Sequence, residues 1–427
     1  MGTDGTVALR LVGADVLHDT GLERRGVLSL AEGLVQDTSD AREVDLTGYR
    51  ILPGIIDLHG DGFERHVAPR RGAMKQMGEG IRATEAELAA NGITTGVLAQ
   101  FFSWEGGLRG PDFAAQVFAG LAEVADQLVT DLIPQLRFEI HQLDAYSDLP
   151  ARIADWGGPY VVFNDHLPHD RLAEGKKPPR LTGQALKAGR NPEKHFEMLL
   201  ELHARRAEVP AALDALCDTL RAQGVRLGSH DDQTEADRAC WRARGARISE
   251  FPETAEAAEA ARTVGDHIIL GAPNVVRGGS HKGNASAIEL IAMGLCDALA
   301  SDYHYPSPRR AALMLAKTGV LALEQAWALL ASGPAHVLGL SDRGVLSAGK
   351  RADLVILDEA DQVAATFTTH RFRNQKRFCF RMEKTSGMEL EKFHVGNFCP
   401  RPIGNSNAVS RSGIRIRRIE INFSRAP

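Results

Sequence analysis

The chain has 427 residues, of which 44% are apolar, and a net charge of −5, so it can bury a large core but gives no case for nucleic-acid binding. It contains no run of about 18 apolar residues, so no membrane span is expected. The N-terminus lacks a secretory signal pattern, and five cysteines without a CxxC pair indicate reduced thiols, so we predict a cytoplasmic protein.

The first part of the chain predicts a small β-sheet, and the middle predicts a barrel. Residues 6–50 alternate short strand-like runs with polar turns. Short β-like runs then alternate with helical stretches such as residues 253–265, and these β-like runs end near residues 59, 100, 141, 166, 230, 251, 274 and 303. Eightfold alternation of strand and helix predicts an α/β protein with a (β/α)8 TIM-like barrel.

The last part of the chain differs in composition from the rest. We predict a small β-sheet domain formed by residues 1–51 and 341–370, a barrel over residues 52–340, and a basic tail over residues 371–427. The tail has 13 Lys and Arg against 4 Asp and Glu and no sustained apolar period. It indicates either a partner-binding or nucleic-acid-binding extension or a non-native, disordered sequence such as one from a shifted reading frame. The second interpretation is favoured because no motif accompanies the charge.

Residue types that bind metals gather where the predicted strands end, which is where barrels hold their catalytic groups. They are His59, Asp61, Glu139, His141, Asp165, His166, His230, Asp231, Asp232, Glu250 and Asp302. A single His–Gly–Asp triplet is more often a helix-capping Asp beside a partly buried His than a metal site. Its recurrence across strands favours a metal site, because imidazole and carboxylate ligands suit Zn²⁺ and similar ions. The set suffices for two ions, which need roughly five or six ligands.

Some of these residues have another explanation. Glu250 either orients a ligand or caps the helix that follows it. Asp231 and Asp232 either support the ligands from behind or cap the next helix. His141 either shares the face of Glu139 or already lies in the loop.

Basic and polar residues follow the first and seventh predicted strands. They are Arg65, His66 and Arg70 after the first, and Arg277, Ser280, His281, Lys282 and Asn284 after the seventh. Glycines in the second group let backbone N–H groups turn inward, and loops after strands seven and eight of barrels often bind phosphate. These residues predict a small phosphorylated substrate.

Several segments resemble the amidohydrolase superfamily and, within it, the α-D-ribose 1-methylphosphonate 5-triphosphate diphosphatases of the carbon–phosphorus lyase pathway. They are LPGIIDLH, LHGDGFERHVAPR, GSHDDQT, SEFPETAEAAEAAR, GAPNVVRGGSHKGN, ASDYHYP and DRGVLSAGKRADLVI. The resemblance implies two divalent ions per chain, with zinc expected first and manganese, iron or nickel as alternatives, and a homodimer. The implied metal ligands are His59, Asp61, Glu139, His166, His230 and Asp302, with Glu139 as the bridge.

The resemblance also implies a reaction in phosphonate catabolism. The 5-triphosphate is hydrolysed to the 5-phosphate and pyrophosphate by a metal-activated hydroxide whose proton passes to Asp302. Arg277 and Lys282 stabilise charge on the phosphoryl oxygens.

This sequence departs from that family in two places. The loop after strand four reads NDHLPHDRLAEGKKPPRLTGQALKAGR where family members have a short loop like DHSPGQ or DHTPGQ, and HGDG stands in place of HTDN. Two other functions therefore stay open. One is an amidohydrolase acting on a cyclic amide or N-acyl substrate, and the other is a non-catalytic protein that binds a phosphorylated ligand. Only a phosphorylated compound needs Arg277 and Lys282 for affinity.

Overall fold

The computed structural model describes residues 8–37, 41–68, 76–158, 160–278 and 285–368, and the backbone of two short strands further on. These are β18 (Arg381–Glu383) and β19 (Lys392–His394), which pair antiparallel. The rest of the tail predicted over residues 371–427 lies outside the described residues, so both interpretations of it stay predictions.

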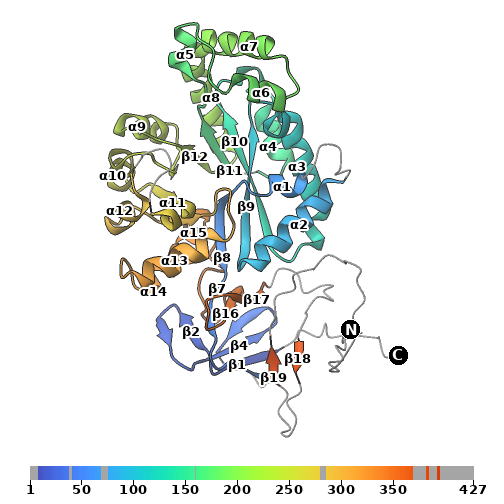
Figure 1. Ribbon diagram of the computed structural model, residues 1–427, viewed down its shortest axis with the longest axis vertical. Helices are drawn as coiled ribbons and strands as arrows, with labels where there is room; N and C mark the ends of the chain where they lie inside the picture. The colour runs from blue at the N-terminus through green and yellow to red at the C-terminus, as the bar shows by residue number, and fades with distance from the viewer. Residues whose placement is uncertain are drawn as a thin grey trace, which may run out of the picture.

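Eight parallel strands form one sheet in which neighbours in the chain are neighbours in space. They are β8 (Ile55–Gly60), β9 (Ile93–Phe102), β10 (Asp131–Glu139), β11 (Tyr160–Asn164), β12 (Leu227–His230), β13 (Ile248–Glu250), β14 (His267–Gly271) and β15 (Ala298–Ala300). Helices cover this sheet (Figure 1). The predicted α/β barrel of alternating strands and helices is confirmed, because each strand ends close to its predicted position.

The first and last strands meet at their carboxyl ends. Gly60 forms an isolated parallel bridge with Asp302. The buried carboxylate of Asp57 accepts hydrogen bonds from the Ser301 backbone N–H at 2.8 Å and from its hydroxyl at 2.5 Å. These contacts close the barrel at the end where the predicted site residues lie.

Most helices connect consecutive strands. They are α1 (Glu64–Val67), α2 (Met77–Ala90), α3 (Pro111–Val124), α4 (Leu149–Asp155), α9 (Glu235–Ala243), α10 (Ala255–Thr263), α11 (Ala272–Arg277) and α12 (Ala287–Ala292), followed after the last strand by α13 (Ser307–Lys317), α14 (Leu323–Ala328) and α15 (Ser332–Leu338). Local sequence explains where several begin. Thr234 and Thr254 cap α9 and α10 with their side chains, which satisfies backbone N–H groups that lack helical partners.

The connection between β11 and β12 is longer than the others and contains four helices. They are α5 (His169–Ala173), α6 (Leu181–Lys187), α7 (Pro192–Ala204) and α8 (Val209–Ala222). Asn191 caps α7, and Pro192 occupies its first turn, both of which favour a helix start. Helices α5 and α7 lie at the end of the molecule opposite the small β-sheets (Figure 1).

Two small sheets lie at the other end of the barrel (Figure 1). One has the order β5-β4-β1-β6 and the other β17-β16-β7-β2-β3. Their strands are β1 (Leu9–Val12), β2 (Asp15–His18), β3 (Gly21–Glu23), β4 (Val27–Ala31), β5 (Leu34–Gln36), β6 (Arg42–Asp45), β7 (Arg50–Pro53), β16 (Leu354–Leu357) and β17 (Val363–Phe367). Strand β16 pairs antiparallel with β7, so the chain returns to its N-terminal part after the barrel. None of the described helices is long and apolar enough to cross a membrane.

Candidate metal centre

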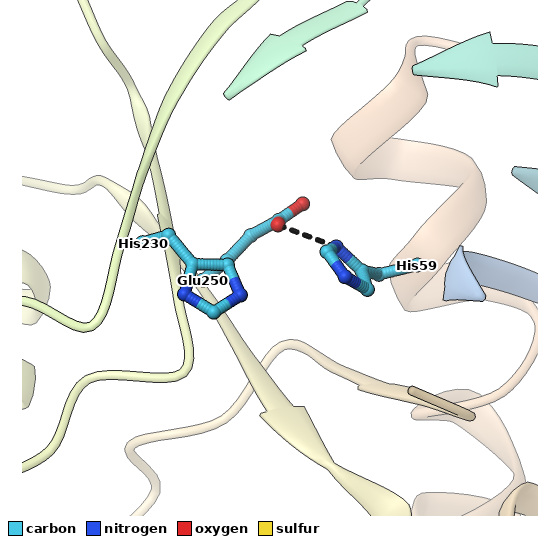
Figure 2. Close-up of side chains that lie close together, drawn as sticks. All are labelled: His59, His230 and Glu250. Atoms are coloured by element: carbon cyan, nitrogen blue, oxygen red, sulfur yellow. Dashed lines mark hydrogen bonds and ion pairs between the residues drawn. The ribbon is translucent and has the colours of Figure 1, made fainter. Parts of the chain in front are cut away.

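His59, at the end of β8, is completely buried and held by Glu250 from β13. Its Nδ1 lies 2.7 Å from Glu250 Oε2, and Figure 2 shows the two side chains directed toward each other beside His230. The other oxygen, Glu250 Oε1, accepts hydrogen bonds from Gln135 and Tyr160, each at 2.8 Å. Burial opposes the charged carboxylate, but His59, His230 and Tyr160 keep the pKa of Glu250 below its ordinary value. Glu250 therefore orients His59, while Thr254 caps the helix that follows.

His230 ends β12 and lies across from His59, with 5.4 Å between the ring centroids. Burial lowers the pKa of His230 to about 4 against the opposing effect of Asp231, and the nearby Arg137 cation lowers it further. The imidazole is therefore neutral at pH 7, which is the form that binds a metal.

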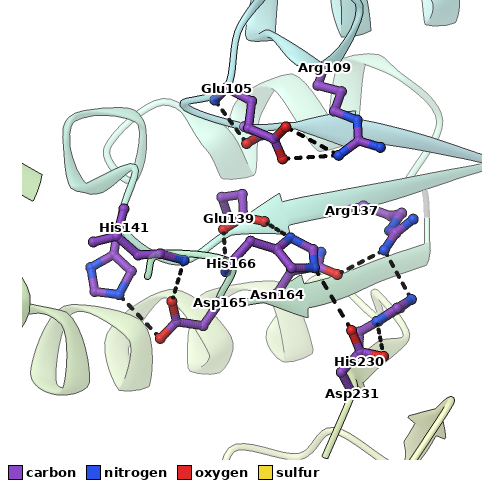
Figure 3. Close-up of polar contacts among 12 residues, drawn as sticks. Glu105, Arg109, Arg137, Glu139, His141, Asn164, Asp165, His166, His230 and Asp231 are labelled. Atoms are coloured by element: carbon purple, nitrogen blue, oxygen red, sulfur yellow. Dashed lines mark hydrogen bonds and ion pairs between the residues drawn. The ribbon is translucent and has the colours of Figure 1, made fainter. Parts of the chain in front are cut away.

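His166 follows β11 and lies between two carboxylates (Figure 3). Its Nδ1 hydrogen-bonds the buried Glu139, which also accepts from the His166 backbone N–H at 3.1 Å. Its Nε2 lies 3.9 Å from Asp231 Oδ2. Burial disfavours the charged ring, but Glu139 and Asp231 outweigh it and raise the pKa of His166 to about 9. The two carboxylates thus favour a positive charge at this position.

Asp61 and Asp302 are brought to the same place by the closure of the barrel. The Asp302 N–H donates to His59 O and the Asp61 N–H donates to Asp302 O, both at 2.9 Å. Burial, and then repulsion by Asp61, raise the pKa of Asp302 to about 6. A carboxyl group with such a pKa is well placed to accept and release a proton near neutral pH.

Backbone conformations with positive φ occur right after the strands that carry the site. Asp231, Phe251 and Asp302 have φ values of 61°, 54° and 54°. Residues other than glycine rarely adopt this backbone conformation, and those that do are often at functional sites. These backbone conformations turn the chain sharply at the strand ends, where the polar side chains gather.

Arg137 is a site residue that the sequence did not reveal. It lies on β10, is 5% exposed, and its NH2 is 3.0 Å from His230 Nε2. Its NH1 is 3.7 Å from Asp61 Oδ2, and its guanidinium carbon is 4.0 Å from the ring centroid of Phe101. Strand alternation offered the only signal, because Arg137 shares one face of β10 with Glu139.

The predicted cationic residues divide into two groups. Arg65 donates to Tyr303 O at 3.3 Å and Arg277 donates to Tyr303 OH at 3.1 Å, so both reach the residue after Asp302. Arg65 also pairs with Glu87, as does His66, whose Nε2 lies 2.5 Å from that carboxylate. The other predicted substrate-binding residues lie outside the described residues; they are Arg70, Ser280, His281, Lys282 and Asn284.

Asp232, predicted to support the ligands or to cap a helix, lies on the other face of the strands. It accepts hydrogen bonds from Ser229 at 2.7 Å and from Ser249 and Arg238 at 2.8 Å. Thr234, rather than Asp231 or Asp232, caps the helix that follows.

Two groups of side chains that include His230 bring potential ligand atoms within 4.8 Å of one another. One is His59, His230 and Glu250, and the other is His166, His230 and Asp231. They share His230, so nitrogen and carboxylate oxygen atoms from the ends of β8, β11, β12 and β13 converge. Asp61, Glu139 and Asp302 lie next to them through the contacts described above.

The chain matches the Amidohydrolase family over residues 63–377. It is 34% identical over 328 residues to the α-D-ribose 1-methylphosphonate 5-triphosphate diphosphatase of Escherichia coli (strain K12), covering 74% of this chain and 85% of that protein. Among solved structures, a Xaa-Pro dipeptidase with bound methionine has a TM-score of 0.57 at 11% identity, covering 85% of this chain and 98% of its own. N-acetylglucosamine-6-phosphate deacetylase from Pasteurella multocida has a TM-score of 0.56 at 10% identity, with the same coverage.

The protein is therefore a metal-dependent hydrolase with an amidohydrolase-type barrel. It belongs to the amidohydrolase family, in the branch that includes the E. coli diphosphatase. The residues present fit a divalent metal. His59 Nε2 is buried and has no hydrogen-bond partner among the described residues, while its Nδ1 is fixed by Glu250. Such an arrangement, with one ring nitrogen held by a carboxylate and the other free, is typical of metal-binding histidines.

Proposed function

We propose that this hydrolase cleaves the triphosphate of α-D-ribose 1-methylphosphonate 5-triphosphate, releasing pyrophosphate and leaving the 5-phosphate. The observation that carries the proposal is the placing of three arginines near Asp302 and Tyr303, the residue that follows it. Arg65 and Arg277 both contact Tyr303, and Arg137 lies close enough to lower the pKa of Asp302 against the effect of burial. Three guanidinium groups suit a polyphosphate far better than a neutral amide. The similarity to the E. coli diphosphatase supports the same substrate.

We propose that His59, His166, His230, Asp61, Glu139 and Asp302 hold the metal. When bound, a divalent ion lowers the pKa of water and polarises a phosphoryl oxygen. Glu250 fixes the ring of His59 through the 2.7 Å hydrogen bond, with Gln135 and Tyr160 behind it. These buried contacts hold the ligand ring in one orientation.

In the proposed reaction, Asp302 accepts a proton from the attacking water. The water oxygen forms a new bond to the α phosphorus, and the bond from that phosphorus to the oxygen that bridges it to the β phosphorus breaks. Pyrophosphate leaves with the bridging oxygen. Arg137, Arg65 and Arg277 stabilise the negative charge that gathers on the phosphoryl oxygens and on the leaving group.

Phosphorus NMR of the zinc-loaded protein with the ribosyl triphosphate tests this proposal. Pyrophosphate and the 5-phosphate are expected to grow together, and the Asp302→Asn variant serves as the inactive control. In ¹⁸O-labelled water, attack at the α phosphorus puts the label in the 5-phosphate, and attack at the β phosphorus puts it in pyrophosphate. If the metal-loaded protein leaves the triphosphate intact but hydrolyses a cyclic amide or an N-acyl compound, the proposal is wrong.

A further inference from the structure

A second cluster of histidines lies beside the candidate metal centre and has no part in it. His141 follows β10, Asp165 follows β11, and His169 begins α5. Figure 3 shows His141 and Asp165 directed toward each other, on the far side of His166 from His230. We propose that His141, Asp165 and His169 bind a divalent transition-metal ion such as Zn²⁺, which fastens helix α5 to the barrel. This inference does not depend on the reaction that the protein catalyses.

Distances between the three potential ligand atoms support the proposal. His141 Nε2 lies 3.1 Å from His169 Nε2 and 3.3 Å from Asp165 Oδ2. His169 Nε2 lies 3.2 Å from that same oxygen. The three atoms therefore form a nearly equilateral triangle. Ligands on a tetrahedral zinc ion, at bond lengths of 2.0–2.2 Å, are separated by about 3.3 Å, so this triangle has the size of one face of such a site.

Hydrogen bonds from both histidines to Asp165 would leave a repulsive contact between the two rings. If both histidines donated to Asp165, their two N–H groups would lie 3.1 Å apart with like partial charges facing each other. One cation replaces both protons and is attracted by both lone pairs and by the carboxylate. His141 is 3% exposed, so it cannot turn its ring into solvent to avoid the contact. The arrangement thus favours a shared cation.

A third histidine, His203, fixes the ring of His169 from behind. His203, on α7, is 9% exposed and its Nδ1 lies 2.9 Å from His169 Nδ1. If His169 donates its Nδ1–H to His203, its Nε2 keeps a lone pair and faces His141 and Asp165. Metal-binding histidines usually have such a partner on the other nitrogen.

The site would be open to solvent on one side. The side chains of Asp165 and His169 are 37% and 32% exposed, which leaves the fourth zinc position for water. The ion would connect the end of β10, the end of β11 and the start of α5. His166 lies between Asp165 and His169 in the chain, so the same ion would hold the backbone that carries a ligand of the candidate metal centre.

One ligand of the proposed site, His169, falls in the loop where this chain departs from the family that it resembles. The segment after strand four reads NDHLPHD, in which His169 stands five residues after Asn164. His203 comes from the four-helix connection that follows. The proposed ion would therefore add a polar attachment between this long connection and the barrel to the apolar packing of Leu172 and Leu199 against Trp104.

Zinc content tests the proposal without any measurement of activity. The double variant His59→Gln/His230→Gln removes ligands of the candidate metal centre, and zinc per chain is measured by mass spectrometry after dialysis against a chelating resin. One zinc per chain is expected to remain, and adding His169→Gln or His141→Gln is expected to abolish it. Adding His336→Gln instead is the matched control. His336 belongs to another close histidine pair, with 5.2 Å between its ring centroid and that of His267, so this change should leave the zinc in place.

Cobalt substitution and proteolysis give a second measurement on the otherwise native chain. Cobalt bound by two histidines and a carboxylate should give visible absorption that His169→Gln removes in part. Zinc should slow proteolysis between α5 and α7 at least tenfold in the wild type and not in His169→Gln. The proposal is overturned if the double variant is folded, as judged by circular dichroism, but retains no zinc. It is also overturned if adding His169→Gln and adding His336→Gln leave equal amounts of zinc per chain.

Discussion

The two faces of strands β12 and β13 hold buried charges in opposite ways. On the inner face, His230 and Glu250 belong to the candidate metal centre. On the outer face, the neighbouring Ser229 and Ser249 donate to Asp232, which also pairs with Arg238 of α9. Consecutive residues of a strand point to opposite sides, so a step of one residue separates the two environments.

The outer cluster is neutralised by the protein itself. Arg238 is 1% exposed and lies between two buried carboxylates, 2.8 Å from Asp232 and 3.3 Å from Asp266. The inner cluster has histidines beside its carboxylates, and His59 Nε2 is buried without a partner among the described residues. Buried charges need a counter-charge. The comparison teaches that Arg238 meets this need on the outer face, whereas on the inner face a buried histidine nitrogen stays free for the proposed metal although Arg137 lies nearby.

The largest effect is expected at Asp302, on the inner side. Asp302→Asn should lower kcat by about 10³-fold, within the range that general-base catalysis contributes, and should leave most of the bound zinc in place. Steady-state kinetics and zinc content on the same preparation check this. Turnover close to that of the wild type would remove Asp302 from the role of base.

A substitution on the outer face is expected to change the stability of the protein but not its zinc content. Arg238→Met should lower the free energy of unfolding by about 3–5 kcal/mol, because it leaves Asp232 and Asp266 buried without their cation. Urea denaturation measures this effect, and zinc content should not change. Arg242→Ala is the matched control, because Arg242 contacts Asp266 from a more exposed position. Zinc loss in Arg238→Met would contradict the separation of the two faces.

Glu139→Gln tests the inner face, where a substitution is expected to change zinc binding. The carboxylate that holds His166 is expected to be a metal ligand, so the variant should bind zinc about 10- to 100-fold more weakly. Zinc affinity measured by competition with a chelator checks this, with Glu105→Gln as the control. Unchanged affinity would reject Glu139 as a ligand.

A smaller effect is expected at the entrance to the site. Arg277→Ala should raise KM for the ribosyl triphosphate about tenfold, because one charge-assisted contact to phosphate is lost. KM for an uncharged amide and the zinc content should stay the same. If KM for both compounds rises equally, Arg277 acts on folding or on the site as a whole.

The smallest effect concerns Glu64, a carboxyl group in which burial and Asp61 outweigh the opposing effect of Arg109 and Arg137. Burial, and then Asp61, raise the pKa of Glu64 to about 7. The folded protein therefore keeps this proton between about pH 4.5 and 7, and its stability falls as the pH rises through that range. Glu64→Gln should stabilise the protein by about 1 kcal/mol at pH 8 and much less at pH 5. Thermal denaturation at both pH values checks this, with the exposed Glu123→Gln as the control.

The sequence by itself determined the order of the strands and the residue types at their ends. Apolar runs separated by helices predicted eight barrel strands, and His59, His166, His230 and Asp302 follow directly from where those runs stop. Chain order is enough here because parallel strands joined by helices bring all their carboxyl ends to one end of the barrel.

Only the tertiary structure decided which side chains meet. Arg137 lies within β10 and Tyr160 begins β11, and a single polar residue in a strand gives no indication of its partner across the barrel. His203 comes from a helix 34 residues beyond His169, and Asp232 turns to the outer face although its neighbours His230 and Asp231 turn inward. Strand order is encoded locally, by periodicity and caps, whereas contacts between distant residues depend on how strands and helices pack.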